Sequence, residues 1–389
     1  MRHSRIVIIG SGIAGLVAAR ALQRLGFRPR IFERSTELTE VGAGLTLAPN
    51  ASHALNAIGL GSLLETKAMQ PGRSGVKHWQ TGELKVALDR GATMIEKHGA
   101  GYYHIHRADL HGALAREVLA ADPDAIQLGA EFRAVRQAGS EVEVDFTMGP
   151  SVRADVVIGA DGLRSTVRAA LFGADQPRFT GYIAFRGLVP IDRLPTGIID
   201  PPSCLATGPD RSFARYLIRG RRVVNFVALA QRDGWREEGW SIPASVAELL
   251  AEYVGWHEDV LTIIRNTPAD GLFKWALFDR EPLLEWTRGR ATLMGDAAHP
   301  MLPFLGQGAG MAIEDALILA RVFADAPSID AALARYFQAR HARTTWVMRK
   351  SRETALAYHS GHDENYQPGQ HITAESLGIW DYNPVTVAV

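Results

Sequence analysis

RIVIIGSGIAGLVAARALQRLGFRPRIFE, residues 5–33, is the segment from which the fold class follows. Its apolar start indicates a buried parallel strand over residues 5–9, and the pattern Gly-Ser-Gly-Ile-Ala-Gly follows at residues 10–15. An apolar helix to about Leu25 and a strand over residues 30–32 complete the unit. This is the dinucleotide-binding fingerprint in its expected setting, because these glycines permit a tight turn, let backbone approach a pyrophosphate and allow the helix to pack on the strand.

Glu33 ends the second strand, at the place where an acid accepts hydrogen bonds from the adenosine ribose. A carboxylate there suits a ribose with free hydroxyls, as in FAD or NAD, and disfavours a ribose that bears a phosphate. The segment therefore predicts a dinucleotide-binding domain and leaves FAD and NAD as alternatives.

A second segment, RATLMGDAAHPMLPFLGQGAGMAIEDALILARVF at residues 290–323, indicates the same order of strand, loop and helix. We expect a strand over Ala291–Met294, a Gly-Asp turn, a loop rich in proline and glycine, and a helix that begins near Gly308. The glycines let the loop approach a flat or phosphorylated ligand, and the helix directs the positive end of its dipole toward that ligand. Taken alone, the segment is equally well an ordinary connection between a strand and a helix.

Three other places carry weaker signals for the same kind of ligand. Gly42–Gly44 either line a ring system or form a tight turn. Arg107 precedes a helix expected over residues 109–119, and its guanidinium is either a donor to a phosphate or ribose or a surface charge. A strand over residues 154–158 runs into Gly-Ala-Asp-Gly at residues 159–162, which repeats the pattern of a strand that ends in a glycine turn.

Composition limits the possible partners of this 389-residue chain. Forty-two basic and 42 acidic residues leave no net charge, which argues against nucleic acid or an anionic membrane as the main partner. No apolar run reaches the roughly 18 residues of a transmembrane helix. The single cysteine, Cys204, cannot form an intrachain disulfide, which fits a reducing compartment, and we expect a cytoplasmic protein with a small-molecule partner.

No metal site is predicted. His104, His106 and His111 are close in sequence, but Arg107 and Asp109 interrupt them, and no further set of carboxylates and histidines follows downstream. The chain is also expected to be a monomer or a homodimer.

The fingerprint with Glu33, the GADG motif at residues 159–162 and the GDAAHP motif at residues 295–300 together resemble the single-component FAD-dependent aromatic hydroxylases. The resemblance extends over roughly residues 5–350, and it is to the branch that includes salicylate hydroxylase and 3-hydroxybenzoate 6-hydroxylase. It implies bound FAD, with NAD(P)H and O2 as co-substrates and a hydroperoxyflavin that transfers oxygen to an electron-rich ring.

The resemblance also implies roles for the glycine motifs and their neighbours. Residues 10–15 and Glu33 would hold the ADP half of FAD, Asp296 would bind a ribityl hydroxyl, and residues 306–310 would border the isoalloxazine ring with Pro303. Arg107 would contact the flavin side, and the GADG motif would lie near the pyrophosphate and the nicotinamide. The residues assigned to the cofactor are Gly10, Ser11, Gly12, Ile13, Ala14, Gly15, Glu33, Arg34, Gly44, Arg107, Asp161, Gly162, Gly295, Asp296, Gly306, Gly308, Ala309 and Gly310.

The strand SFARYLIRG, residues 212–220, departs from this family pattern. The salicylate and 3-hydroxybenzoate enzymes commonly carry a His four positions before the Tyr, where this chain has Ser212 before Tyr216. Strand alternation places Tyr216 and Ser212 on one face and Arg215 on the other, unless a bulge reverses the faces. Arg215 and Arg186 are alternative anchors for a substrate carboxylate. The candidate catalytic residues are Tyr216, Arg215, Arg186 and Pro303.

The expected fold class is α/β, with a Rossmann-type FAD-binding domain on a parallel sheet, a mostly antiparallel sheet domain for the substrate, and C-terminal helices. The expected helices near the end are Ile329–His341 and Thr344–Tyr358, followed by a mobile polar tail, His359–Gln370. The domain bounds that we expect are 1–70, 99–178 and 280–325 for FAD, 71–98 and 179–279 for the substrate sheet, and 326–389 for the C-terminal helices and tail.

The leading hypothesis is an FAD-dependent monooxygenase that hydroxylates a small hydroxylated aromatic or heteroaromatic carboxylic acid resembling salicylate. One alternative is an FAD-dependent epoxidase or a hydroxylase of a larger metabolite. An alternative from another class is a non-catalytic dinucleotide-binding regulator, although a regulator does not need the loop at residues 303–310.

Overall fold

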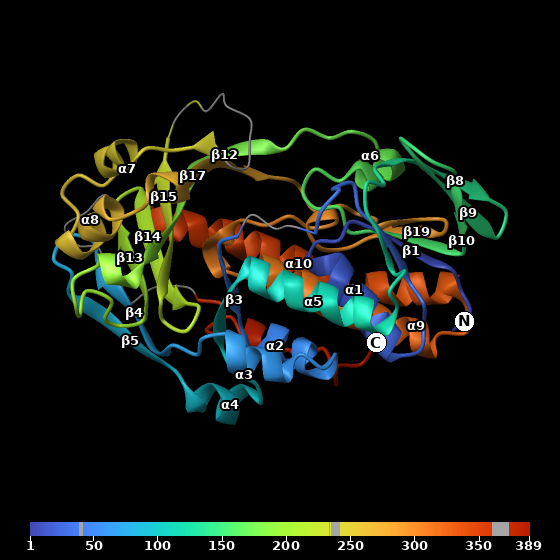
Figure 1. Cartoon of the computed structure of the whole chain (residues 1–389), viewed down its shortest axis with the longest axis horizontal. Coiled ribbons are helices and arrows are strands. Elements are labelled where there is room, and N and C mark those ends of the chain that lie inside the picture. The colour runs from blue at the N-terminus through green and yellow to red at the C-terminus, as the bar shows by residue number, and fades with distance from the viewer. Residues whose placement is uncertain (39–41, 233, 235–241, 360–372) are drawn as a thin grey trace.

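The computed structural model describes residues 1–38, 42–232, 234, 242–359 and 373–389. Its described part is elongated, with a parallel sheet and its helices at one end and a large antiparallel sheet at the other (Figure 1). This is the α/β architecture that the sequence predicts. Within the described part, no helix is both long and apolar enough to span a membrane.

The first sheet is built on the buried strand β1, whose Val and Ile residues are covered on both faces. Neighbouring strands are parallel except for the edge pair β18 and β19. The strand order is β18 (Thr287–Arg288), β19 (Ala291–Leu293), β11 (Val156–Gly159), β1 (Ile6–Ile9), β2 (Arg30–Phe32), β7 (Ile126–Gln127). The helices α1 (Ile13–Arg24), α5 (Arg107–Ala121) and α9 (Gly308–Asp325) pack together beside this sheet.

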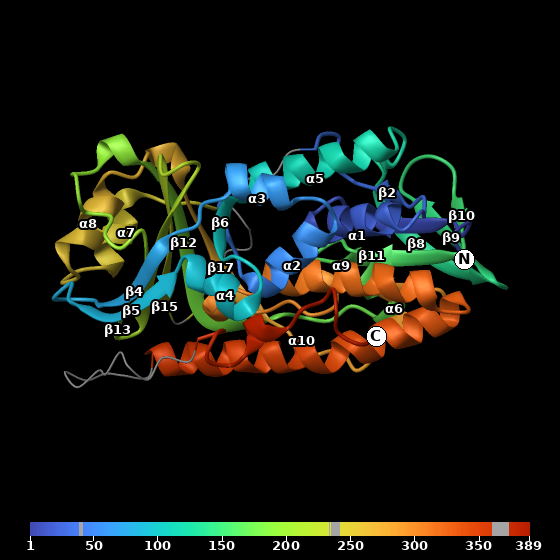
Figure 2. The ribbon, with the colours of Figure 1, turned by 90° about the horizontal axis from the view of Figure 1, so that it is seen from below.

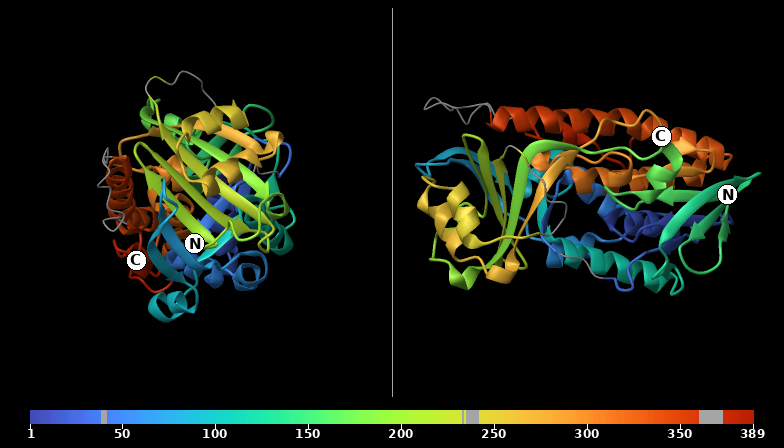
Figure 3. Two further views of the ribbon diagram at one scale, coloured as in Figure 1. Left: turned by 90° about the vertical axis from the view of Figure 1, so that its left-hand side faces the viewer. Right: turned by 90° about the horizontal axis from the view of Figure 1, so that it is seen from above.

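The second large sheet has eight strands and is antiparallel except where β13 meets β4. Its order is β16 (Ile242–Pro243), β17 (Leu272–Asp279), β12 (Arg178–Pro190), β15 (Val223–Gln231), β14 (Arg211–Ile218), β13 (Ser203–Gly208), β4 (Gly72–His78), β5 (Leu84–Arg90). The short helices α7 (Val246–Glu252) and α8 (Glu258–Arg265) cover its outer face, which is the face directed away from the parallel sheet (Figure 3).

The inner face of the eight-stranded sheet is identified by its register and its packing. Tyr216 lies opposite Asn225, and the next inward-facing row along the strands pairs Val227 with Arg186. Other inward-facing side chains of the sheet form one hydrophobic cluster with Leu302 and Phe304 of the second glycine-rich segment. The inner face is therefore closed by the loop at residues 302–305.

A two-stranded ribbon connects the two large sheets. Its strands are β3 (Gly44–Leu47) and β6 (Tyr103–His106), and β6 also contacts β14. The ribbon brings residues 44–47 and 103–106 to the inner face of the eight-stranded sheet. The remaining elements are α2 (Pro49–Ala57), α3 (Gly61–Lys67), α4 (Ala92–His98), α6 (Thr166–Phe172), the antiparallel strands β8 (Phe132–Ala138), β9 (Glu141–Phe146) and β10 (Val152–Ala154), and the 3-10 turns 191–193, 269–271, 295–297, 303–305 and 379–381.

The C-terminal helix differs from the prediction of two helices. A single helix, α10 (Ile329–His359), runs along the molecule past both large sheets (Figure 2). The expected break at residues 342–343 does not occur because Ala and Arg are strong helix formers and no Gly or Pro interrupts the segment. Of the polar tail that we expected to be mobile, His359–Gln370, residues 360–370 lie outside the described residues.

Residues 373–389 return along the helices and are fixed by charged contacts. Glu375 accepts a hydrogen bond of 2.6 Å from the buried Arg90, and Arg343 of α10 donates to the Ile379 carbonyl at 2.9 Å. Because β4 and β5 belong to the eight-stranded sheet, we propose the division into a discontinuous cofactor domain, a substrate sheet domain and a C-terminal unit with the bounds given above.

Candidate active site

The three fingerprint glycines are required for three different physical reasons. Gly10 has φ +101°, and a Cβ there would lie 2.7 Å from the Ala160 carbonyl oxygen. A Cβ on Gly15 would lie 2.0 Å from the Gly10 carbonyl oxygen, so this glycine permits α1 to pack on β1. A Cβ on Gly12 would meet nothing within 4 Å, so Gly12 borders open space at the N-terminus of α1. That space is where a pyrophosphate would approach.

Glu33 ends β2 beside this turn, as predicted. Its carboxylate accepts hydrogen bonds from the Ser11 backbone N–H at 2.8 Å and from the Ser11 hydroxyl at 3.0 Å. These bonds hold an acidic group next to the turn at residues 10–15, where the sequence predicts a contact with a ribose. Arg34, the next residue, is exposed.

The loop before α9 presents small and exposed residues between buried ones. Pro303 and Gly306 are exposed, whereas Leu302 and Leu305 beside them are buried. Gly306 has φ +63°, which a residue with a side chain rarely adopts. The N-terminus of α9 begins at Gly308 and carries no side-chain cap, so its N–H groups remain available to a negatively charged or polar ligand.

Buried charges on α9 and α10 fix the start of this loop. Asp315 accepts hydrogen bonds from the Gly295 backbone N–H at 3.0 Å and from Arg340 at 2.7 Å, and it lies 2.5 Å from His299. Burial raises the pKa of Asp315, but His299 and Arg340 outweigh burial and bring this pKa down to about 2. An ionised Asp315 therefore holds the backbone of the predicted cofactor loop in place.

A second buried contact fixes the end of the loop. Asn50 of α2 donates to Gln307 at 3.0 Å and to Glu314 at 2.6 Å, and Arg343 of α10 neutralises Glu314. Gln307 immediately precedes the first turn of α9. The Gly308, Ala309 and Gly310 segment is thus positioned by α2 and α10 as well as by its own helix.

Two predicted cofactor residues have distinct environments. Asp296 is exposed at the surface, and desolvation by the surrounding protein atoms raises the pKa of its carboxyl group. Asp161 instead uses its carboxylate inside the protein, because it accepts hydrogen bonds from the Thr166 and Val167 backbone N–H groups at the start of α6. Gly162, with φ +77° and open space around it, is the part of the GADG motif that can face a ligand.

Tyr216 is buried on the inner face of the eight-stranded sheet and contacts the ribbon. Its ring stacks on His104 of β6 with centroids 4.0 Å apart. A Cβ on Gly44 would lie 2.4 Å from the Tyr216 ring and 2.8 Å from Asn225, and the Gly44 N–H donates to the Asn225 side chain at 2.7 Å. Gly44, predicted to bind the cofactor, is therefore a glycine that lets Tyr216 and Asn225 approach the ribbon.

Arg186 extends from the inner face toward the same group of side chains. Burial lowers the pKa of Arg186, while Tyr216 raises it and Arg107 lowers it further, so the three side chains lie close together. The Arg186 guanidinium lies 4.9 Å from the Trp275 ring centre. Among the described residues no carboxylate pairs with Arg186, and its buried Nε has no hydrogen-bond partner there.

Arg215 does not share this environment, which argues against the anchoring role that we considered for it. β14 pairs with β15 without a register shift, so Arg215 lies on the outer face, opposite to Tyr216. Its guanidinium is buried and donates to the backbone carbonyls of Pro201 at 2.8 Å and Asp200 at 3.3 Å. Arg215 thus supports the chain before β13 and is not available to a ligand at the inner face.

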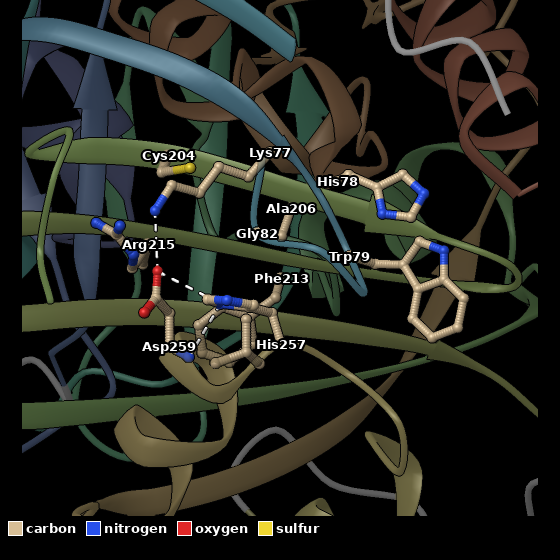
Figure 4. A pocket seen from close by; sticks show the side chains of 11 residues that line it. Lys77, His78, Trp79, Gly82, Cys204, Ala206, Phe213, Arg215, His257 and Asp259 are labelled. Atoms are coloured by element: carbon tan, nitrogen blue, oxygen red, sulfur yellow. Dashed lines mark hydrogen bonds and ion pairs between the residues drawn. The ribbon is translucent and has the colours of Figure 1, made fainter. Parts of the chain in front are cut away.

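A separate small cavity lies beside Arg215 on the outer face (Figure 4). The Lys77 ammonium and the Asp259 carboxylate, 2.9 Å apart, neutralise each other at its edge. Cys204, the single cysteine, is buried in its wall. The sheet separates this cavity from Tyr216 and Arg186, so we do not assign it to the site.

Three polar residues at the inner face were missed by the sequence analysis: Thr46, His104 and Asn225. His104 was considered only as a metal ligand, and among the described residues no group of three or more possible ligands gathers around it. A usable signal existed in the strand RVVNFVALA, where Asn225 is the one polar residue in an apolar run. Nothing near Thr46 in the sequence marks it as a site residue.

Comparison with known proteins gives consistent matches over nearly the whole chain. The FAD binding domain family matches residues 3–351. The 3-amino-4-hydroxybenzoate 2-monooxygenase PtnB3 of Streptomyces platensis is 40% identical and covers 91% of this chain and 88% of its own length. The 6-hydroxynicotinate 3-monooxygenase of Pseudomonas fluorescens is 32% identical over 90% of each chain. A salicylate hydroxylase substrate complex has a TM-score of 0.82 at 26% identity, over 99% of this chain and 97% of its own.

Proposed function

The chain belongs to the FAD binding domain family and is an FAD-dependent aromatic monooxygenase, and on this premise we propose that it hydroxylates a benzoate ring bearing a hydroxyl and an amino group. The family membership confirms the resemblance found in the sequence, and it does not support a non-catalytic regulator. We propose this substrate ring because several similar proteins, among them PtnB3, are named 3-amino-4-hydroxybenzoate 2-monooxygenases.

The residues of this chain fit FAD. Glu33 and the open space at Gly12 suit the ADP half, and the exposed Gly306 and the uncapped start of α9 suit a flat ring with a polar edge. Bound FAD would take two electrons from NAD(P)H and activate O2, so that one oxygen atom of O2 would enter the substrate ring and the other would leave as water. We propose that the predicted cofactor residues hold FAD between the turn at residues 10–15 and the start of α9. Asp161 would contribute indirectly, because its carboxylate holds the first turn of α6.

Arg186 carries the proposal for the substrate, because it is a desolvated cation on the face that the cofactor loop closes. A substrate carboxylate would supply the negative partner that Arg186 lacks among the described residues. The same interaction would place the ring between Arg186 and Tyr216. The ring hydroxyl would then face Thr46, which belongs to the ribbon, and Tyr216, which packs against the ribbon.

The side chains near Arg186 and Tyr216 would give a bound ring apolar neighbours and would shield it from water. Val227 and Leu229 on the sheet pack with Leu302 and Phe304, which flank the exposed Pro303. Ala214, opposite Val227, adds a small side chain and leaves space in front of the sheet. We propose that Pro303 borders both the cofactor ring and the substrate, so that oxygen transfer takes place away from bulk water.

The test is a comparison of ring acids with the purified, FAD-loaded enzyme. NADH and NADPH oxidation, hydroxylated product and H2O2 are measured with 3-amino-4-hydroxybenzoate, 6-hydroxynicotinate, salicylate and 3-hydroxybenzoate. We expect 3-amino-4-hydroxybenzoate to stimulate the oxidation most and to give product in excess over H2O2. If no ring acid yields product while a larger aromatic metabolite does, the alternative of a hydroxylase for a larger metabolite replaces this proposal. Cytoplasmic location and a monomeric or dimeric state stay predictions.

A further inference from the structure

His104 lies beside Tyr216 on the inner face, whereas β14 itself carries no histidine and has Ser212 four positions before Tyr216. The two rings are stacked with an interplanar angle of 13°, and the ring of Tyr102 meets His104 edge-on at 5.3 Å. His104 is 1% exposed. A buried imidazole is thus delivered to the inner face by the ribbon, from a different part of the chain.

Both nitrogens of this imidazole have hydroxyl partners. Nδ1 lies 3.3 Å from the Thr46 hydroxyl, and Nε2 lies 3.0 Å from the Ser203 hydroxyl. A neutral imidazole accepts a hydrogen bond at one nitrogen while it donates at the other. The three side chains therefore form a continuous line of groups that can each accept one proton and release another.

The pKa of His104 indicates whether its imidazole would hold the substrate proton as a charged base or would only transfer the proton onward. Burial lowers the pKa of His104 to about 3, and the positive charge of Arg90 on β5 contributes to the lowering. An imidazole with so low a pKa is a weak acceptor of a net proton at neutral pH. Transfer of a proton through the His104 imidazole does not leave the imidazole charged, because one of its nitrogens gains a proton as the other loses one.

The two ends of the line lie in different surroundings. Thr46 lies next to the predicted cofactor loop, since a Cβ on Gly306 would be 4.0 Å from the Thr46 Cβ. Hydrogen bonding with the Thr46 side chain also lowers the pKa of Tyr216 and of Tyr102, whose pKa values burial raises. At the other end, Ser203 lies beside the half-buried Ser74 of β4, near the edge of the sheet. Ser203 itself is 9% exposed, which is the contact with solvent that the far end of the line retains.

We propose that Thr46, His104 and Ser203 form a proton relay that removes the proton of the substrate's ring hydroxyl, in place of the histidine that β14 lacks. This inference rests on the proposed function. The substrate O–H donates its proton to the Thr46 oxygen while Thr46 passes its own proton to His104 Nδ1. His104 releases the proton on Nε2 to Ser203, and Ser203 passes one to water. One proton leaves the ring oxygen and one reaches solvent, so the ring becomes an electron-rich phenolate.

The test uses FAD-loaded enzyme with 3-amino-4-hydroxybenzoate as the probe. The variants are Thr46→Val, Ser203→Ala and the hydroxyl-retaining Thr46→Ser. Thr267→Val is the matched control, because Thr267 is a buried threonine whose hydroxyl bonds the Ile263 carbonyl under the outer face. Two quantities are measured: the pH at which the bound ring hydroxyl ionises, followed by ultraviolet difference absorbance without turnover, and the product formed per NADH oxidised.

We expect Thr46→Val and Ser203→Ala to shift ionisation of the bound probe to higher pH and to slow product formation by about 100-fold. FAD content and flavin reduction should match the Thr267→Val control, and Thr46→Ser should restore most of the loss. Ser203→Ala is the sharpest variant because Ser203 does not touch the substrate. If Ser203→Ala ionises the bound probe and forms product as the wild type does, the relay is overturned, even if Thr46→Val forms product more slowly. A wild-type enzyme that forms no product from any ring acid instead overturns the proposed function.

Discussion

The guanidinium of Arg340 on α10 lies 2.7 Å from the carboxylate of Asp315 on α9, and both side chains are fully buried. Arg340 also pairs with Glu314 at 2.6 Å. Through Asp315 this C-terminal helix reaches the Gly295 backbone, so a charge outside the cofactor domain positions the loop that we propose to bind the flavin. Two predictions follow from this network, a third from the two faces of the antiparallel sheet and a fourth from the glycine turn after β1.

Replacing Arg340 with Met should destabilise the protein by about 3–5 kcal/mol, because it removes the buried guanidinium from Asp315 and leaves Glu314 with Arg343 as its remaining cation. FAD content should fall in the same variant. The measurement is urea unfolding together with the flavin absorbance of the purified protein. The matched control is Arg335→Met on the same helix, whose exposed pair with Asp325 should contribute less than about 1 kcal/mol. Equal effects of the two variants would contradict the prediction.

Stability should fall in acid partly through Asp315. Its pKa in the folded protein, about 2, lies below the ordinary value of 3.8, so its contribution is fully present above about pH 5 and is lost as the pH falls toward 2. The contribution is roughly 2 kcal/mol. Urea unfolding of wild type and Asp315→Asn at pH 6 and pH 3 measures it. The difference in the free energy of unfolding between the two proteins should be smaller at pH 3 than at pH 6. An equal difference at the two pH values would show that Asp315 is not the group that titrates.

Replacing Arg186 with Met should raise KM for the aromatic acid by at least about tenfold, since loss of one partner of a desolvated ion pair costs about 2 kcal/mol or more. Arg215→Met is the matched control, because Arg215 is an equally buried arginine on the outer face. It should lower the melting temperature and leave KM nearly unchanged. An analogue without the carboxyl group, 2-aminophenol, should not distinguish wild type from Arg186→Met. A KM that rises only in Arg215→Met would reverse our assignment.

Gly12→Ala and Gly15→Ala should separate cofactor binding from folding. A Cβ on Gly15 would lie 2.0 Å from the Gly10 carbonyl oxygen, so Gly15→Ala should not give a stable protein. A Cβ on Gly12 meets no protein atom within 4 Å, and Gly12→Ala should fold but bind FAD at least about tenfold more weakly. Thermal unfolding and FAD titration of the apoprotein test both statements. Wild-type FAD affinity in Gly12→Ala would show that the open space is not the cofactor's.

Local sequence signals predicted the cofactor half of the molecule well. The fold class, the helix that begins at Gly308 and the family resemblance are confirmed. The break that we expected within α10 was wrong, since residues on both sides of it pack along one continuous helix. Substrate-side residues were harder to predict because they come from separate strands that carry no shared motif.

Glycine spacing and strand-end acids by themselves determined that this chain binds a dinucleotide, because turns and helix N-termini are built from neighbouring residues. Tertiary structure alone decided which arginine lies on the inner face with Tyr216, since Arg186 and Arg215 are both strand residues and the pairing of β12, β14 and β15 separates their faces. It also decided that His104 stands beside Tyr216. That contact joins two segments far apart in the chain, and no local preference encodes it.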